Sequence, residues 1–163
     1  MFWDKVAIFY DFFETVYNSK VYRGLGKKVA EEIMQNDVVL ECACGTGAIS
    51  RYIAPKCRLL IATDLSKGML KQTSKKCRKY HNIKIKHADM MRLSCRDNKF
   101  DKVVAGNVIH LLEDPYSAIN ELKRVCKPGG KIIIPTYINL CEGANRRAAR
   151  LLEAAGVKFM RQF

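Results

Sequence analysis

The chain has 163 residues, 48% of them hydrophobic and 28% charged, and its net charge is +13. This length favours one domain spanning 1–163, and the balanced composition excludes a largely disordered chain. No apolar run approaches the roughly 18 residues of a membrane span, and the first residues lack the pattern of a signal peptide.

The first 35 or so residues are predicted to be helical. Aromatic side chains crowd the first half of this segment, and Leu25, Val29 and Ile33 recur at helical spacing in the second. Gly24 and Gly26 weaken the second helix near its start. Residues 1–35 therefore form either helices packed on a sheet edge or a lid over a pocket, and both interpretations stay open.

After residue 35, strand and helix patterns alternate. Strands are predicted at 38–42, 58–63, 83–87, 100–105, 131–137 and 157–163, and helices at 46–54, 66–79, 115–126 and 144–155. Ser66 and Asp114 are expected to cap two of these helices. The alternation predicts an α/β fold for 36–163, with right-handed βαβ units around a parallel sheet and ligands bound at the carboxyl ends of its strands.

The most informative segment is 38–47. An apolar run reaches Glu41, and a turn of small residues with Gly45 and Gly47 follows directly. Glycine allows the backbone to approach a ligand closely. A phosphate-binding loop has little use for the carboxylate, so the pattern favours a zwitterionic or cationic nucleoside such as S-adenosylmethionine.

Polar side chains also follow the next three predicted strands. Asp64 ends the second and can accept from both ribose hydroxyls of a nucleoside. Asp89 follows the third and can accept from an adenine amino group, while Asn107 follows the fourth. Each alone would be an ordinary cap or turn residue, but together they indicate a ligand site.

These motifs resemble those of the class I S-adenosylmethionine-dependent methyltransferases, and most closely the small-molecule branch that includes ubiquinone and menaquinone biosynthesis enzymes. The resemblance covers residues 9 to 140 and rests on 41–47, 62–66, 88–90, 100–104 and 127–131. It implies a Rossmann-like, doubly wound, mostly parallel sheet with helices on both faces. It also implies S-adenosylmethionine as cofactor, with S-adenosylhomocysteine as product, bound by Tyr10, Glu41, Ala43, Cys44, Gly45, Thr46, Gly47, Asp64, Leu65, Met69, Asp89, Met90, Asn107 and Val108.

Two departures from the family pattern stand out. The family usually has glycine where Ala43 stands, which restricts backbone approach slightly. The family sheet usually ends with an antiparallel hairpin, whereas this sequence stops at Phe163, within or just after the first hairpin strand. We therefore expect an incomplete C-terminal hairpin and an exposed hydrophobic sheet edge that favours homo-oligomers.

His110 is the candidate catalytic base, because it follows the fourth strand and histidine titrates near neutral pH. The competing interpretation is a histidine packed in the 107–112 turn. His81 and His87 are expected to be structural. The small size and the aromatic N-terminal helices favour a small, apolar methyl acceptor.

The basic charge leaves RNA or another polyanion as an alternative substrate or partner. Against it, the densest cations fall in one predicted helix and the next strand without interleaved aromatic residues, at Lys71, Lys75, Lys76, Arg78, Lys79, Lys84 and Lys86. The seven cysteines lack zinc-site spacing, so no metal site is expected, and they suggest reduced thiols in a cytoplasm.

Two other functions compete with a methyltransferase. A nicotinamide-dependent oxidoreductase would explain the glycine turn and Asp64, but it gives Glu41 and Asp89 no role. A module that binds S-adenosylmethionine without activity would need the same pocket as the enzyme, so the motifs do not separate the two.

Overall fold

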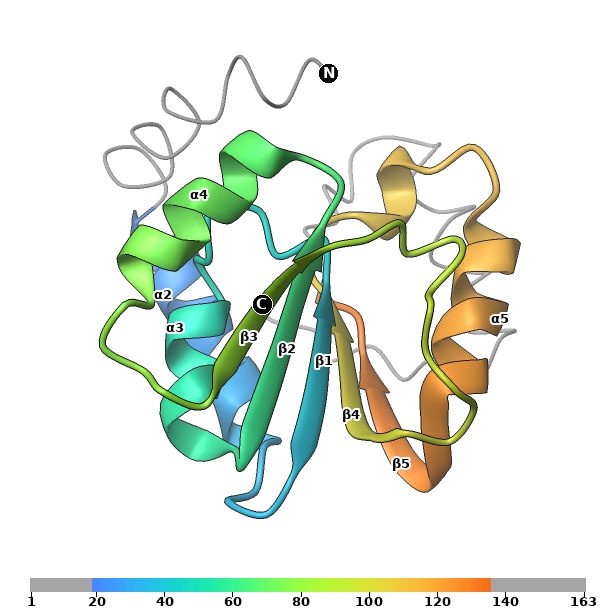
Figure 1. Cartoon of the computed structure of the whole chain (residues 1–163), viewed down its shortest axis with the longest axis horizontal. Helices are drawn as coiled ribbons and strands as arrows, with labels where there is room; N and C mark the ends of the chain where they lie inside the picture. The colour runs from blue at the N-terminus through green and yellow to red at the C-terminus, as the bar shows by residue number, and fades with distance from the viewer. Residues whose placement is uncertain (1–18, 136–163) are drawn as a thin grey trace.

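The computed structural model describes residues 19–135, with side chains from residue 23. Five strands in this region form one sheet in the order β3-β2-β1-β4-β5 (Figure 1). The strands are β1 (Val38–Cys42), β2 (Leu59–Asp64), β3 (Ile83–His87), β4 (Phe100–Ala105) and β5 (Cys126–Ile133). All neighbouring strands pair in parallel, and the sequence order reverses between β1 and β4. The predicted doubly wound α/β fold is confirmed.

Within the described residues, four α-helices connect or flank these strands. They are α2 (Ser19–Glu31), α3 (Ser50–Ile53), α4 (Lys67–Lys76) and α5 (Pro115–Val125), with short 3₁₀ helices η1 (Ala54–Lys56) and η2 (Ile109–Leu111). The predicted caps are confirmed: Ser66 Oγ accepts from the Met69 N–H at 3.1 Å, and Asp114 Oδ1 accepts from the Ser117 N–H at 3.0 Å. No helix within 19–135 has both the length and the apolar character that crossing a membrane requires.

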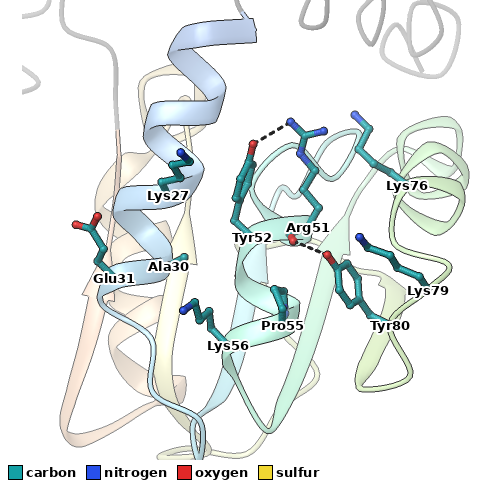
Figure 2. A pocket seen from close by; sticks show the side chains of 10 residues that line it. All are labelled: Lys27, Ala30, Glu31, Arg51, Tyr52, Pro55, Lys56, Lys76, Lys79 and Tyr80. Atoms are coloured by element: carbon teal, nitrogen blue, oxygen red, sulfur yellow. Dashed lines mark hydrogen bonds between the residues drawn. The ribbon is translucent and has the colours of Figure 1, made fainter.

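The helices α2, α3 and α4 cover one face of the sheet. Val29 and Ile33 pack with Val39 of β1 and Leu60 of β2 in the core beneath them. Figure 2 shows Tyr52 of α3 standing beside α2. Gly26 makes this contact possible, because a Cβ there would lie within 2.8 Å of Tyr52 Cε2. Gly26 lowers the intrinsic helix propensity of α2, but it allows α2 to pack closely against Tyr52.

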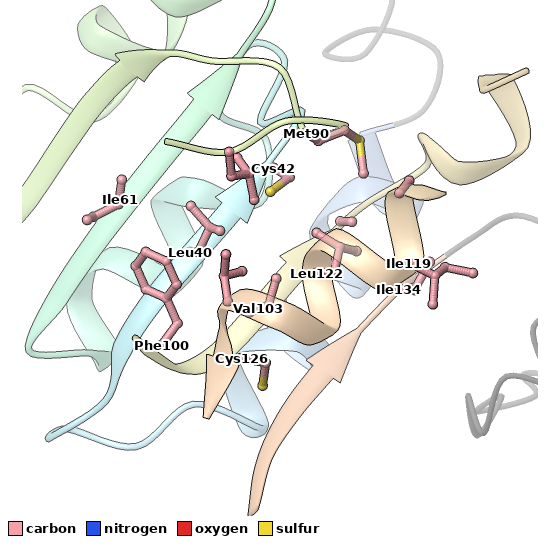
Figure 3. Packing of buried hydrophobic residues seen from close by; sticks show 14 of the residues in the cluster. Leu40, Cys42, Ile61, Met90, Phe100, Val103, Ile119, Leu122, Cys126 and Ile134 are labelled. Atoms are coloured by element: carbon pink, nitrogen blue, oxygen red, sulfur yellow. The ribbon is translucent and has the colours of Figure 1, made fainter. Parts of the chain in front are cut away.

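The helix α5 covers the other face (Figure 3). Leu40 and Cys42 point to this side of β1, opposite to Val39 and Glu41, as the two-residue repeat of a strand requires. Ile119 and Leu122 of α5 pack against them through a cluster that also holds Phe100. Both faces of the central strands are therefore buried, which explains the continuous apolar run of β1.

Several boundaries differ from the predictions. The helix expected from residue 46 begins at Ser50, because the backbone of 43–47 forms a turn with positive φ angles. The helix α4 ends at Lys76 rather than at residue 79. Strand β5 begins at Cys126 rather than at residue 131. Residues 127–130 form a bulge in it, because they lie opposite one residue of β4, Asp101.

Several predictions fall outside the described residues. They are the first 18 residues with Tyr10 and the proposed lid, the helix at 144–155, the strand at 157–163 and the incomplete hairpin. Association through an exposed sheet edge also stays a prediction.

Candidate functional site

The predicted site residues gather at one edge of the sheet. Glu41 is the last residue but one of β1, and Asp64 ends β2. Asp89 and Asn107 follow β3 and β4 by two residues each. Because these four strands are parallel, their carboxyl ends share one edge (Figure 1). The reversal of strand order between β1 and β4 lies at the same place, which is where open α/β sheets bind ligands.

The turn at 43–47 has an unusual backbone. Ala43, Gly45 and Gly47 all have positive φ angles, of 51°, 56° and 80°. The Cys44 N–H donates to the Thr63 carbonyl at 2.9 Å, and the Gly47 N–H donates to the Cys44 carbonyl at 3.0 Å. Two glycines meet this geometry without strain, whereas Ala43 adopts it at a steric cost.

Asp64 anchors the turn to β2. Its Oδ2 accepts from the Gly45 N–H at 2.9 Å, and its Oδ1 accepts from the Ser66 N–H at 2.8 Å. The side chain is partly exposed, and each carboxylate oxygen can accept a second hydrogen bond. Asp64 therefore shapes the turn and still has acceptor capacity for a ligand hydroxyl.

The helix α4 supports the turn from its other side. Thr73 Oγ1 donates to the Gly45 carbonyl at 2.7 Å, and Lys76 Nζ donates to Thr46 Oγ1 at 3.1 Å. Thr73 also limits Gly47, where a Cβ would lie 3.2 Å from the Thr73 Cα. The sequence predictions missed both α4 residues, because they lie about 30 positions from the turn and no local pattern marks them.

Glu41 is a buried carboxyl with spare acceptor capacity. Its side chain is 1% exposed, and neither Glu41 Oε2 nor Ser50 Oγ has a hydrogen-bond partner among the described residues. Burial raises the pKa of Glu41 to about 8, and the negative charge of Asp64 acts in the same direction, while the nearby Ser50 hydroxyl opposes the shift. A cationic group at this position would favour the ionised form and supply the missing partner.

Asp89 and Asn107 are both held in fixed turns. Asp89 Oδ1 accepts from the Met91 N–H at 2.9 Å. Asn107 has a φ of 53°, and its N–H donates to the Pro135 carbonyl at 2.8 Å. Asparagine tolerates this left-handed region better than most residues. Both side chains are partly exposed at the strand-end edge.

The other predicted contact residues differ in their accessibility. Leu65 is 40% exposed, whereas Met69 is buried. Met90 is also buried, in the core cluster next to α5, and Val108 packs partly against that cluster (Figure 3). His110 is exposed on η2, at the rim of the same edge.

The two cysteines near the turn are expected to be unreactive thiols. Burial raises the pKa of Cys42 to about 12 and that of Cys44 well above its usual range. The thiolate is the nucleophile and the metal ligand, so neither residue suits those roles at neutral pH. Within 19–135, no three potential metal-ligating side chains gather in one place, and the six cysteines there are all free thiols.

Comparison with known proteins agrees with this architecture. The family profile described as "Methyltransferase domain" matches residues 40–134, and the chain belongs to this family. A demethylmenaquinone methyltransferase from Staphylococcus saprophyticus is 30% identical over 130 residues, which make up 76% of this chain. The match spans 55% of that relative, so this chain covers about half its length.

Solved structures share the fold. A protein from Methanococcus maripaludis, described as an S-adenosyl-L-methionine-dependent methyltransferase, has a TM-score of 0.73 at 21% identity, over 94% of this chain and 72% of its own. A SAM-dependent methyltransferase from Aquifex aeolicus has a TM-score of 0.69 at 23% identity, over 83% of this chain and 81% of its own. The family match supports the methyltransferase interpretation over the oxidoreductase.

Proposed function

We propose that this chain binds S-adenosylmethionine at the strand-end edge and transfers its methyl group to a small-molecule acceptor. The observation that carries the proposal is the buried Glu41, whose Oε2 has no partner among the described residues, next to the left-handed 43–47 turn at the reversal of strand order. Such a setting suits a cationic ligand that approaches the backbone closely.

The residues fit the parts of this cofactor. Glu41 and the turn of Ala43, Cys44, Gly45, Thr46 and Gly47 would hold the methionine portion, and Asp64 the ribose hydroxyls. Asp89, with Met90 behind it, would accept from the adenine amino group, and Leu65 and Met69 would border the nucleoside. Asn107 and Val108 would lie beside the methyl donor, with Tyr10 closing over the site.

The bound cofactor supplies an activated methyl group on a sulfonium centre. The task of the chain is then to orient the acceptor and to exclude water, since alignment at near-attack distance provides much of the rate. A base is needed only when the acceptor atom carries a proton. His110, which is exposed on η2, is our candidate for that base.

For the acceptor class, we infer a small, ring-containing apolar molecule. The support is the demethylmenaquinone methyltransferase among the relatives, whose name indicates a quinone-type substrate. The six free thiols among the described residues, five of them buried, support a reducing compartment such as the cytoplasm.

Calorimetric titration of S-adenosylmethionine, S-adenosylhomocysteine and NAD into the purified chain tests the cofactor. We expect the first two to bind and Asp64→Ala to weaken them about tenfold or more, because it removes a charged acceptor. Glu113→Ala is the control, since Glu113 is an exposed carboxylate that is not among the residues assigned to the cofactor. Binding of NAD alone, or equal losses in both variants, would contradict the proposal.

A further inference from the structure

A pocket lies on the face of the molecule that α2, α3 and α4 cover. It is a pocket of about 670 Å³ between α2, the segment formed by α3 and η1, and the end of α4 (Figure 2). This volume falls within the range of about 300 to 1,000 Å³ that is usual for small-molecule sites. None of the residues assigned to the cofactor lines it.

Five of the ten residues that line this pocket are cations. It carries Lys27, Arg51, Lys56, Lys76 and Lys79 against one acid, Glu31, so its net charge is +4. The cations come from α2, α3, η1 and α4 and from the residues just beyond α4. Segments far apart in sequence thus bring their charges to one concavity, where the fields of like charges add.

Four of these cations have no ion pair with an acid among the described residues. The ion pairs within residues 19–135 use Lys102, Arg124, Lys127 and Lys131. Lys27, Arg51, Lys56 and Lys79 take part in none of those pairs. A concavity with several uncompensated cations favours an anion of matching charge.

Two tyrosines hold part of the cationic wall in place. Arg51 Nη2 donates to the Tyr52 hydroxyl at 3.1 Å, and the Tyr80 hydroxyl donates to the Arg51 carbonyl at 3.0 Å. The Arg51 guanidinium carbon lies 4.9 Å from the Tyr52 ring centre, and Lys79 Nζ lies 5.1 Å from that of Tyr80. Cations that are already positioned lose less entropy when a ligand binds.

We propose that this basic pocket binds a small molecule that carries two or more phosphate groups. A single carboxylate brings one negative charge, whereas a polyphosphate chain brings a charge comparable to that of the wall. Arginine and lysine are the side chains that bind phosphate oxygens most effectively. The pocket is partly open to solvent, but its volume matches a small molecule rather than a polymer. This site does not depend on the proposed methyl transfer.

Calorimetry with inorganic tripolyphosphate and with ATP, each without added metal, tests the site. We expect both to bind, in the presence and in the absence of S-adenosylhomocysteine, and to weaken as NaCl rises from about 50 to about 200 mM. Tighter binding of ATP would identify a nucleotide, and equal binding would identify the phosphate chain as the recognised part. Absence of binding by either compound would overturn the proposal.

Paired charge reversals localise the binding. A double variant with Lys56→Glu and Lys79→Glu brings the net charge of the wall from +4 to zero. We expect it to weaken tripolyphosphate binding about tenfold or more. Lys84→Glu with Lys86→Glu changes the total charge equally on exposed positions of β3 outside the pocket, and should change affinity less than about twofold. Lys76 stays intact in both variants, because it donates to Thr46.

A measurement on the unmodified protein provides a second check. Amide NMR shifts during the tripolyphosphate titration should concentrate at residues 51–56 and 76–80. Equal losses in the two variants, shifts spread over the whole basic surface, or binding of single-stranded RNA without binding of tripolyphosphate would each overturn the proposed pocket.

Discussion

Ala43 shows how one residue strains the loop that the chain otherwise builds with glycine. Its φ of 51° costs a residue with a Cβ about 1 kcal/mol. We therefore expect Ala43→Gly to raise the free energy of unfolding by up to about 1 kcal/mol, reduced by the larger entropy of glycine in the unfolded chain. Chemical denaturation measures this change.

Ala118→Gly is the matched control for Ala43→Gly. Ala118 is buried in α5, where glycine lowers helix stability by about 1 kcal/mol. The two alanine-to-glycine changes should therefore act in opposite directions. If both destabilise the protein, strain at Ala43 is not significant.

His110 has a separate prediction at the residue scale. If it accepts a proton from the acceptor, His110→Ala should lower turnover by about 100-fold while the affinity for S-adenosylmethionine stays near that of the wild type. Because His110 is exposed on η2, we expect the variant to fold like the wild type, so a loss of turnover would report on the reaction. Unchanged turnover with an identified acceptor would remove His110 from the mechanism.

At the scale of elements, α2 contains two glycines with different environments. A Cβ at Gly24 would have no heavy atom within 4 Å, whereas one at Gly26 would overlap the Tyr52 ring. We expect Gly24→Ala to stabilise the protein by about 0.5 to 1 kcal/mol through helix propensity. Gly26→Ala gains the same propensity but should destabilise by about 1 to 3 kcal/mol through overpacking.

A double-mutant cycle checks the cause of the Gly26 effect. In a Tyr52→Ala background, the cost of Gly26→Ala should shrink, because the ring atoms that the new Cβ meets are gone. An unchanged cost would place the effect elsewhere in α2. Thermal or chemical unfolding of the four variants provides the measurement.

For the molecule as a whole, Glu41 couples stability to pH. Its pKa is raised by burial from 4.5 to about 8, so the folded state keeps a proton that the unfolded state releases above pH 4.5. The stability from this proton is complete below about pH 4.5 and is lost as the pH rises through about 8. Relative to Glu41→Gln, the wild type should lose up to about 1.4 kcal/mol per pH unit within this window.

Urea unfolding of the wild type and Glu41→Gln at several pH values between 5 and 8, without cofactor, measures the effect. Glutamine keeps the shape and stays neutral, so other titrating groups cancel in the difference. A difference that is independent of pH would mean that Glu41 is ionised in the folded protein.

Charge at the molecular scale was only partly readable from the sequence. The dense basic run near residues 71–86 divides in the fold, because Lys76 and Lys79 line the pocket whereas Lys84 and Lys86 do not. Lys27, Arg51 and Lys56 join them from other segments. The run of basic residues in the sequence therefore did not predict which cations line the pocket.

The sequence by itself determined the features that depend on local chemistry. Apolar runs placed β1 and β4, and alternation of apolar and polar residues placed β3. Capping side chains marked the starts of α4 and α5, and a repeated strand-helix pattern implied a parallel sheet with Glu41, Asp64, Asp89 and Asn107 at one edge. These elements and positions follow from the periodicity of the sequence and from the direction of the strands, and residues close together in the chain specify both.

Only the tertiary structure decided the contacts between distant segments. It showed that Thr73 and Lys76 support the turn, that Glu41 is buried enough to hold a proton near neutral pH, and that three helical segments border a basic pocket. Burial and hydrogen bonding across about 30 residues depend on how helices dock on the sheet, and no short-range pattern encodes that docking.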